Sequence, residues 1–573
     1  MAPVGFRRVR DFDPQNFASP ESVEDVCELV RRAVNARGTV RVRGAGHSDT
    51  PSIYTDAFDP MTGPQPAPET TNILLDKLRK WEETGSHIVV GAGHHLGVDP
   101  YARGDGEWDR NSLVRKLDNL KLSLDSLGGI SHQTLGGFLS TGSAGASRKY
   151  ELTEAIDWIT LVDGTGEIRK LERGKNPEFD AAIVSMGLLG IIVEVGFSRS
   201  RLQPWFDLKM TSQMFRRVDF APMTEKGKLD DFFNQNDYAR ILWWPQPGVD
   251  LVEVWTGQRV VPHDPSQPIV PYTSFGPSVQ RTAHWLYSSV VEKLPHLFND
   301  RVPAKQEWLR TRVCNEINRV LLEMGSDENA PSALQSPGAV AGATLELLQS
   351  LMGIGGAPPQ GGSAPEVPAE SGNEMLLAAI LNTLFEPFLA AGPVPAYDRW
   401  YTALPHDNQI DDDAIPIVFT ESWVDVERAD GVILALRKLF VDRRLAATGT
   451  LCFEIYPAKQ RAAWLSPARP DLAGKGHDVL RVDPFAYWAG STSREQAIHG
   501  MFALHWQCMK AFDFRSHWGK VLEPGCPESR TFREQVFPKL KQFKELRSRW
   551  DPYNVFVQDF WDDHLGLTPS YSP

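Results

Sequence analysis

The sequence predicts an α+β protein whose larger, C-terminal part is built on an antiparallel sheet flanked by helices. Three observations support this fold class. Within about residues 20–200, one helical pattern precedes a series of short strands that alternate with glycine turns. Paired strand patterns follow at 238–245 and 251–256, and a strand–helix–strand pattern covers 415–456.

The composition is that of an ordinary globular protein. The chain has 573 residues, of which 42% are hydrophobic and 23% charged, and this length allows two or three domains with sizeable cores. It carries 73 acidic and 60 basic residues, a formal net charge of -13, and no basic block. We therefore expect no nucleic-acid partner.

Neither a secretory leader nor a transmembrane segment is expected. Residues 1–10 contain arginines but no apolar stretch. The most apolar long run, 375–391, is interrupted by Asn382, Glu386 and Pro387, which favours a buried or lid helix over a membrane span.

The cysteines indicate a reducing environment. They are odd in number, lie far apart and form no Cys-x-x-Cys pair. We expect a cytoplasmic protein without a metal site, in which most cysteines are core residues: Cys27, Cys314, Cys452, Cys508 and Cys526.

The N-terminal part is organised around a glycine turn with a histidine at its tip, Arg43-Gly44-Ala45-Gly46-His47-Ser48. Gly44 and Gly46 can adopt positive φ angles and let the main chain approach a ligand closely. Successive amides of such a turn form a concavity suited to a pyrophosphate, with His47 near the aromatic end of a nucleotide. A plain polar turn is the alternative interpretation of this short motif.

The other N-terminal elements follow in order. Residues 22–34 have helical spacing, with Ser22 as a suitable N-cap. Short strands are expected at 39–43, 72–75 and 88–90.

A second glycine-rich stretch covers residues 127–147. Its small and hydroxyl side chains suit a backbone pressed against a flat or phosphorylated ligand, whereas a flexible polar loop would lack the core residues Leu135, Phe138 and Leu139. A hairpin over 156–171 and a glycine turn that leads into a strand over 186–195 complete this part.

Beyond residue 200 the pattern changes. The strands at 238–245 and 251–256 are expected to pair with one face buried. A strand is also expected over 415–424, a helix over 429–440 and a strand over 449–456.

Between these strands lies an unusual region. Helical spacing recurs at 285–294, 307–324 and 373–389. A segment rich in Gly, Pro, Ser and Ala over 326–372 is interpreted as a mobile loop, linker or partly disordered insertion.

Four N-terminal motifs together resemble the FAD-binding domain of the vanillyl-alcohol-oxidase superfamily over about residues 10–200. They are the glycine–histidine turn, Thr-Leu-Gly-Gly with Thr-Gly-Ser at 134–143, Asp-Gly-x-Gly at 163–166 and Gly-x-x-Gly-Ile-Ile at 187–192. The resemblance implies two small α/β subdomains within residues 1–202, with FAD linked through its 8α-methyl group to His47. Many relatives have a histidine where this chain has Ala144. The implied cofactor-binding residues are Arg43, Gly44, Ala45, Gly46, His47, Ser48, Gly128, Gly129, Thr134, Gly136, Gly137, Thr141, Gly142, Gly145, Ala146, Gly190, Ile191, Val193 and Lys520.

The C-terminal part resembles the aldonolactone oxidase and alditol oxidase branch of that superfamily. Residues 515–520, Arg-Ser-His-Trp-Gly-Lys, are similar to its Arg-Pro-His-Trp-(Ala/Gly)-Lys signature. Glu454 matches the acid of its Glu-(Ile/Val)-Arg strand, but Tyr456 stands where the branch has arginine. The resemblance implies a substrate domain over 203–573, with an insertion at about 262–400 and a segment, 511–560, that returns to the flavin.

Oxidation of an alcohol on a flavin requires a C–H bond held about 3–3.5 Å from the acceptor atom, a proton acceptor and a charge near the ring. Lys520 is expected to supply that charge at the N1/C2=O edge, although a solvated lysine is the plainer alternative. Glu454 alternates with Phe453 and Ile455, so it points away from them and can hold the substrate hydroxyl, unless it is a surface carboxylate.

Two further candidates complete the catalytic set. His517 fits a packed, supporting histidine better than a base. In place of the arginine, Tyr456 predicts weaker recognition of small polyhydroxy substrates. Gly128 is expected over the C4a/N5 region of the flavin, where a glycine goes with access of O2, so the resemblance implies an oxidase that forms H2O2 and not a dehydrogenase.

The expected function is oxidation of a polyol or sugar lactone, with a small-molecule alcohol and O2 as reaction partners. One alternative is an oxidase of a bulkier or lipophilic alcohol, for which sterol oxidases are the precedent and apolar faces at 376–389 would line the pocket. A flavin-binding subunit without turnover is the other.

Overall fold

The computed structural model describes residues 17–568, apart from 60–62, 65–68, 98–110, 247, 274–279, 281–380, 383–384, 386–387, 409, 411–415, 444–449, 471–477 and 488–491. The predicted helices at 285–294 and 307–324, the segment 326–372 and most of 373–389 lie outside the described residues. Among the described helices, none combines the length and the apolarity needed to cross a membrane.

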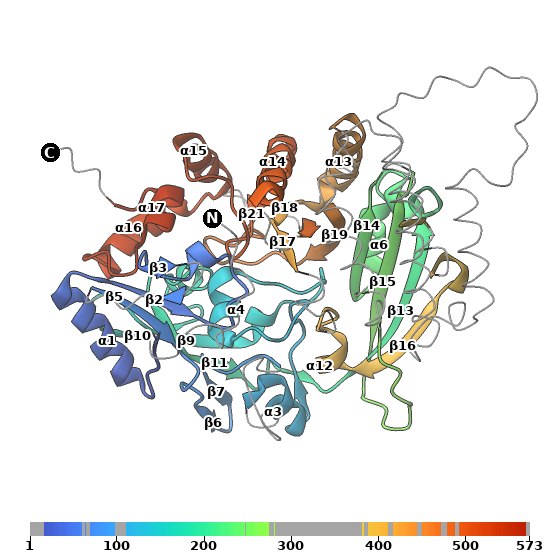
Figure 1. Ribbon diagram of the computed structural model, residues 1–573. Helices are drawn as coiled ribbons and strands as arrows, with labels where there is room; N and C mark the ends of the chain where they lie inside the picture. Colours follow the sequence, from blue (N-terminus) through green and yellow to red (C-terminus); the bar gives the residue numbers. More distant parts are fainter. Residues whose placement is uncertain are drawn as a thin grey trace, which may run out of the picture.

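Two sheets form the N-terminal part of the molecule (Figure 1). A parallel sheet has the strand order β1-β5-β2, and an antiparallel sheet has the order β10-β9-β11-β7-β6. All strands predicted for this part are present, so the α+β class is confirmed here. Their bounds are β1 (Phe17–Ala18), β2 (Thr39–Arg43), β5 (Thr70–Leu74), β6 (Trp81–Glu83), β7 (His87–Gly91), β9 (Ile156–Val162), β10 (Ile168–Glu172) and β11 (Ile191–Ser198).

The predicted first helix is α1 (Val23–Ala36), and its N-cap is Ser22 as expected. The Ser22 hydroxyl accepts a hydrogen bond from the Asp25 amide at 3.1 Å, and the Asp25 carboxylate accepts one from the Ser22 amide at 2.9 Å. This capping box satisfies two amides that the helix leaves unpaired. The apolar face of α1, including Val26 and Val30, is fully buried.

The glycine-rich stretch 127–147 contains a helix that its composition did not predict, α4 (Leu135–Thr141). The Thr134 hydroxyl caps it by accepting from the Gly137 amide at 3.2 Å. Burial of Leu135, Phe138 and Leu139 offsets the weak helical tendency of the glycines. Smaller helices of this part are α3 (Leu113–Asn119) and α5 (Phe179–Ala182).

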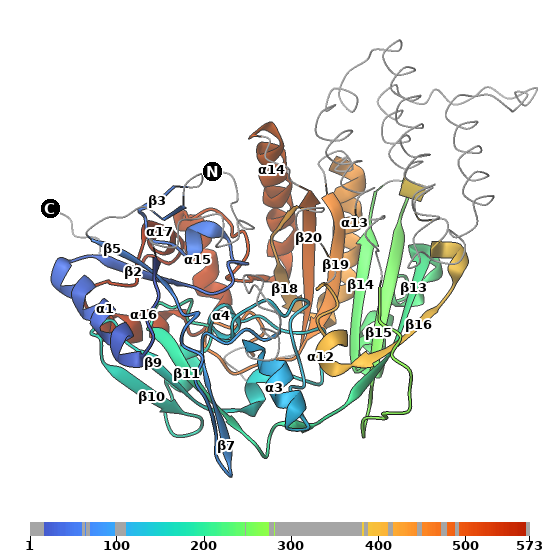
Figure 2. The same cartoon turned by 60° about the horizontal axis from the view of Figure 1, so that its bottom comes forward.

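The C-terminal part is built on a nine-stranded antiparallel sheet. Eight of its strands have the order β16-β13-β15-β14-β19-β20-β18-β21, and the ninth, β17, pairs with β20. Figure 2 shows its strands side by side. Their bounds are β13 (Asp207–Arg216), β14 (Tyr238–Trp244), β15 (Leu251–Val260), β16 (Val394–Arg399), β17 (Ile417–Phe419), β18 (Ser422–Asp425), β19 (Thr450–Ala458), β20 (Val479–Tyr487) and β21 (Arg515–Ser516).

The expectation that β14 buries one face was wrong, because each of its residues is buried. Helices α6 (Lys228–Gln235), α13 (Ala429–Arg443) and α14 (Thr492–Met509) cover one face of the sheet and share a core with its apolar side chains. The opposite face of the sheet lines a cavity shared with the N-terminal part, and polar side chains such as Arg240 and Glu454 are buried there.

The strand predicted over 415–424 is divided into β17 and β18. Thr420 and Glu421 leave the ladder and bind the returning C-terminal segment: the Thr420 hydroxyl donates to the Val521 carbonyl at 2.7 Å, and the Glu421 carbonyl accepts from the His517 amide at 3.1 Å. This break turns the Glu421 side chain into the cavity described below.

The end of the chain returns to the N-terminal part, where red helices lie beside blue strands in Figure 1. These helices are α15 (Pro527–Val536), α16 (Leu540–Trp550) and α17 (Asp559–Leu565). The Val40 amide donates to the Val555 carbonyl at 2.7 Å, and the Asp49 amide donates to the Gly519 carbonyl at 3.0 Å. The glycine–histidine turn and the segment before Lys520 are therefore neighbours.

Candidate active site

The first cavity has a volume of about 950 Å³ and lies among β2, α4 and the turn before β11. Its walls include Arg43, Gly44, Ala45, Gly46, His47, Ser48, Thr134, Gly136, Gly137, Thr141, Gly190 and Ile191 from the predicted set, together with Arg41, Ser140, Gly187, Trp518, Phe556 and Trp561.

The glycine turn presents unpaired amides to this cavity. In the described part of the chain, the backbone amides of Gly44, Gly46, His47 and Ser48 have no hydrogen-bond acceptor. Gly46 has a φ of 80°, and a Cβ atom on Gly44 would lie 2.3 Å from the Thr134 hydroxyl. The turn therefore requires glycine at both positions and offers the amides that an anion such as a pyrophosphate needs.

The second cavity, of about 880 Å³, lies between the glycine-rich stretch and the polar face of the nine-stranded sheet. His47 and Gln133 line both cavities, so the two meet at the histidine. The predicted residues that line the second cavity are Gly128, Gly129, Glu454, Tyr456, His517 and Lys520, with Ala144 beside them. Sequence analysis did not single out Asp407, Glu421 or Arg481, which line it as well.

His47 is neutral at the junction. Burial, with His132 and Lys520 nearby, lowers the pKa of His47 well below its ordinary value. Its Nε2 atom is buried and has no hydrogen-bond partner in the described part of the chain. An uncharged imidazole nitrogen is thus available where the two cavities meet.

Lys520 also lacks a polar partner for its side chain. Within the described residues, its Nζ atom makes no hydrogen bond or ion pair, and it lies 4.0 Å from the centre of the Phe419 ring. Burial lowers the pKa of Lys520 more than the nearby carboxylate of Glu421 raises it. The ammonium group is thus available to a ligand.

His517 shapes the turn that leads to Lys520. Its Nδ1 atom accepts a hydrogen bond from the Gly519 amide at 3.1 Å, and its own amide donates to Glu421. Burial lowers the pKa of His517 to about 3, so the imidazole is neutral near pH 7. These contacts fit the supporting role expected from the sequence better than that of a base.

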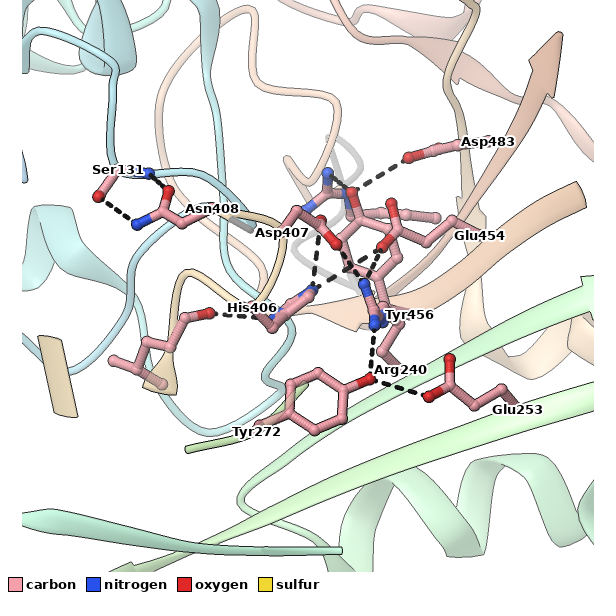
Figure 3. A network of polar contacts seen from close by, with 12 residues as sticks. Ser131, Arg240, Glu253, Tyr272, His406, Asp407, Asn408, Glu454, Tyr456 and Asp483 are labelled. Atoms are coloured by element: carbon pink, nitrogen blue, oxygen red, sulfur yellow. Dashed lines mark hydrogen bonds and ion pairs between the residues drawn. The ribbon is translucent and has the colours of Figure 1, made fainter. Parts of the chain in front are cut away.

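Arg240 bridges two carboxylates at one wall of the second cavity (Figure 3). Its Nη1 atom contacts Asp407 Oδ1 and lies 3.4 Å from Glu454 Oε1. Its Nη2 atom donates to the Tyr272 hydroxyl at 3.1 Å, and Tyr272 donates to Glu253 at 2.9 Å. The network fixes Asp407 and Glu454 while each keeps a second oxygen.

Asp407 belongs to a short polar segment, 406–408, that is tied to the glycine-rich stretch. The Asp407 amide donates to the Gly129 carbonyl at 2.8 Å. The Asn408 side chain makes two hydrogen bonds with Ser131, at 2.7 and 2.8 Å. Ligand atoms of His406, Asp407 and Glu454 lie within 4.8 Å of one another, but the Arg240 guanidinium already supplies a cation there. A run of three polar residues was the sequence signal for this segment.

A second charged group lies around Arg481 on β20. Its Nε atom donates to Glu421 Oε1 at 2.6 Å, and its guanidinium stacks 3.7 Å from the centre of the Tyr456 ring. The Tyr456 hydroxyl donates to Asp483 at 3.1 Å. Burial raises the pKa of Asp483 well above its ordinary value, and Glu421 adds to this shift. No sequence motif pointed to Arg481 or Asp483.

Four of the predicted cofactor residues line neither cavity: Gly142, Gly145, Ala146 and Val193. Gly142 ends α4 with a φ of 77°. A Cβ atom on Gly145 would lie 2.3 Å from the Ser126 hydroxyl. The carbonyls of Ala146 and Val193 accept from the amides of Ala239 and Ala92. These four residues make local contacts, and their place at a cofactor stays a prediction.

Comparison with known proteins places similarity on the C-terminal part of the chain. Residues 419–564 match the family model of D-arabinono-1,4-lactone oxidase. The chain is 30% identical over 234 residues to D-arabinono-1,4-lactone oxidase of Candida glabrata, which covers 40% of this chain and 39% of that protein. Over part of its length the chain is therefore similar to D-arabinono-1,4-lactone oxidases.

L-gulonolactone oxidase of Bos taurus supports the same relation, with 28% identity over 237 residues that cover 40% of this chain and 46% of that enzyme. The chain thus matches less than half the length of these relatives. The region matched by the family model contains Glu421, Glu454, Arg481 and Lys520 of the second cavity and Trp518, Phe556 and Trp561 of the first.

Cholesterol oxidase from Brevibacterium sterolicum shares the fold over nearly the whole chain. The TM-score is 0.59 at 15% identity, and the alignment covers 96% of this chain and 93% of that structure. At this level of identity the similarity concerns the fold alone. It supports the predicted architecture of a two-sheet N-terminal part joined to a large antiparallel sheet.

Proposed function

We propose that the protein is an FAD-dependent oxidase of a polyol or sugar lactone. In the proposed reaction a hydroxyl-bearing carbon loses a hydride and its oxygen loses a proton, and O2 takes up the two electrons and two protons as H2O2. Residues 1–202 would bind FAD and residues 203–573 the substrate. The observation that carries this proposal is the meeting of two cavities at His47, one with unpaired amides and one with charged side chains.

The residues of the first cavity fit FAD. The unpaired amides of Gly44, Gly46, His47 and Ser48 would hold the pyrophosphate, and the glycines at 136, 137 and 190 leave room for the backbone to lie close to a ligand. The buried Nε2 atom of His47 has no hydrogen-bond partner among the residues that the structure describes, and the neutral ring keeps a nucleophilic nitrogen. We therefore propose a covalent link between His47 and the flavin.

Bound FAD would supply the hydride acceptor at the junction of the cavities. Lys520 would place its unpaired ammonium group against the edge of the flavin, where negative charge grows during reduction. Glu454, fixed by Arg240, would accept the hydroxyl proton or a hydrogen bond from the reacting hydroxyl. Tyr456 and His517 would hold the wall of the pocket in place.

The charged lining of the second cavity favours a polyhydroxy substrate. Asp407, Glu421 and Glu454 can accept hydrogen bonds, and Arg481 and Lys520 can donate them. A lipophilic alcohol would leave Lys520, which makes no hydrogen bond or ion pair among the described residues, without a polar partner, at a free-energy cost of about 1–3 kcal/mol. From the stretch expected to line a sterol pocket, Phe385 instead packs on Trp244, with ring centres 4.6 Å apart.

A first experiment tests the cofactor. The purified protein is precipitated with acid, and visible spectra of pellet and supernatant are recorded beside those of His47→Ala. We expect the flavin to stay with the wild-type pellet and to leave the variant. Flavin released from the wild type would contradict the covalent link, and a colourless wild type would contradict the proposed cofactor.

A second experiment tests the reaction. D-arabinono-1,4-lactone, L-gulono-1,4-lactone, xylitol, sorbitol and a series of hydrophobic alcohols are offered in air, with H2O2 as the readout. Turnover of hydrophobic alcohols alone would support the sterol-like alternative. If no substrate bleaches the flavin, the protein is a binding subunit without turnover.

A further inference from the structure

Two positions at which the chain departs from its relatives' pattern, 144 and 456, contact the same residue, Arg481. The Nη1 atom of Arg481 donates to the carbonyl of Ala144 at 2.8 Å, where many relatives have histidine. The guanidinium stacks on the ring of Tyr456, where the aldonolactone oxidases have arginine, and also hydrogen-bonds its hydroxyl. The two departures are therefore neighbours in space, although 312 residues separate them in the sequence (456 minus 144).

Strand register explains why Arg481 reaches the place of the missing arginine. Tyr456 on β19 lies directly opposite Arg481 on β20, and Glu454 lies opposite Asp483. Residues directly opposite each other in an antiparallel pair share one face of the sheet, with Cβ atoms about 4.5–5.5 Å apart. A guanidinium carried by position 481 can therefore serve the same part of the cavity as one carried by position 456.

The surroundings keep Arg481 charged and leave it one donor. Burial lowers the pKa of Arg481, but Glu421 and Tyr456 raise it more, so the pKa lies above its ordinary value. Its Nε and Nη2 groups bind Glu421 and Tyr456, and Nη1 binds Ala144 with one of two hydrogens. The other Nη1 hydrogen has no acceptor in the described structure, and Arg481 lines the second cavity.

We infer that Arg481 is the specificity-determining cation of the second cavity, which binds an oxygen of the polyol or lactone away from the reacting carbon. It takes the place of the arginine that Tyr456 has displaced, and Tyr456 positions it by stacking. This inference rests on the proposed function and names the residue by which the site recognises a polyhydroxy substrate.

The test moves the guanidinium group from position 481 on β20 to position 456 on β19. Arg481→Thr should raise KM for D-arabinono-1,4-lactone by about 10- to 100-fold, the effect of losing a charged hydrogen bond, with a smaller change in kcat. Tyr456→Arg in the Arg481→Thr background returns a guanidinium to the same face and should recover at least half of the loss on a logarithmic scale. Tyr456→Arg alone should bring no gain, because two guanidinium groups would crowd one site.

A further variant separates the loss of substrate binding from a loss of stability. Removal of Arg481 leaves the buried Glu421 unpaired, which destabilises a protein strongly. Arg481→Met combined with Glu421→Gln removes both charges, and flavin content with the visible spectrum reports whether the site is intact. An unchanged KM in this double variant, or a KM in Arg481→Thr that Tyr456→Arg does not improve, would overturn the inference.

The failure of the proposed function gives a different result. In that case the wild-type protein itself oxidises neither lactones nor polyols, and the inference falls with it. If the wild type oxidises them and the Arg481 variants do so with the same KM, the proposed function stands and the role of Arg481 does not.

Discussion

Two residues, Lys520 and Asp407, present charged groups to the second cavity. Lys520 Nζ makes no hydrogen bond or ion pair among the described residues, and a buried charge is seldom left in this state unless a ligand completes it. Asp407 lines the cavity, with Oδ1 held by Arg240 and Oδ2 3.6 Å from His406 Nε2. Both residues therefore give predictions that a purely structural role would not.

Lys520→Met should slow flavin reduction without loss of the flavin from the first cavity. Removal of a charge that acts mainly in the transition state lowers kcat, and we expect a loss of about 100-fold or more with a small change in KM. Stopped-flow spectroscopy of the flavin under argon measures the step directly. The control is Lys541→Met, since Lys541 is exposed on α16. A variant that reduces its flavin at the wild-type rate would remove Lys520 from the mechanism.

Asp407→Asn should weaken substrate binding more than turnover. The amide can still accept from Arg240, so the bridge to Glu454 survives, but the charge that accepts a substrate hydroxyl is lost. We expect KM for xylitol to rise by about tenfold, the low end for a hydrogen bond to a charged group. Asn408→Ala is the matched control from the same segment, because Asn408 binds Ser131 and not the cavity. An equal effect of both variants would mean that the segment only supports the loop.

The glycine turn after β2 depends on the absence of a Cβ atom at residue 44. A Cβ atom on Gly44 would meet the Thr134 hydroxyl at 2.3 Å, whereas the Cβ and Cγ2 atoms of Thr134 would lie 3.5 Å away. Gly44→Ala should therefore reduce the flavin content of the purified protein, and adding Thr134→Ala should restore part of it by removing that hydroxyl. The restoration is partial because α4 loses its N-cap, at a cost of about 1 kcal/mol.

Gly85→Ala is the control for this pair, because a Cβ atom there has no neighbour within 4 Å. The flavin-to-protein absorbance ratio measures the outcome. Normal flavin content in Gly44→Ala would contradict the tight approach of the turn to Thr134, and an unimproved double variant would place the steric conflict elsewhere.

Local sequence patterns predicted elements well and contacts across the sheet poorly. The capping box at Ser22, the hairpin of β9 and β10 and the strand β19 follow from residues close in the sequence. The face of Glu454 also followed from alternation, since Phe453 and Ile455 lie in the core and Glu454 lines the cavity. The division of β17 from β18 did not, because hydrogen bonds from about 100 residues away cause it.

The same limit explains which site residues sequence reasoning missed. Arg481 reaches the cavity only because β20 pairs with β19 in one register, and a shift by one residue would turn it into the core. Asp407 reaches it because its own amide binds the carbonyl of Gly129, a residue far earlier in the chain. No spacing within a short window reveals either contact, whereas the glycine turn and the motif ending at Lys520 are contiguous in the sequence.

On the scale of the whole molecule, burial of neutral histidines makes stability depend on pH. Burial lowers the pKa of His94, His505 and His517 to about 3 in each case. The unfolded chain binds protons at these residues near pH 6.5. Between pH 6.5 and 3 the unfolded chain therefore holds more protons at these three residues than the folded protein does, so they lower the free energy of unfolding as the pH falls. Buried carboxyl groups with a raised pKa, such as Asp49 at about 7, act in the opposite direction.

Chemical denaturation of the wild type and of a histidine variant, compared from about pH 6.5 downward, isolates the contribution of one histidine. Each such histidine contributes a slope of about 1.4 kcal/mol per pH unit once its unfolded form is fully protonated. His505→Gln should make the slope shallower by about that amount, because glutamine can keep the hydrogen bond to Ser422 but takes up no proton. His499→Gln is the matched control, since His499 is exposed on the same helix, α14. Equal slopes for His505→Gln and the wild type would mean that the imidazole is already protonated in the folded protein, and the buried core beneath the sheet would then hold a charge.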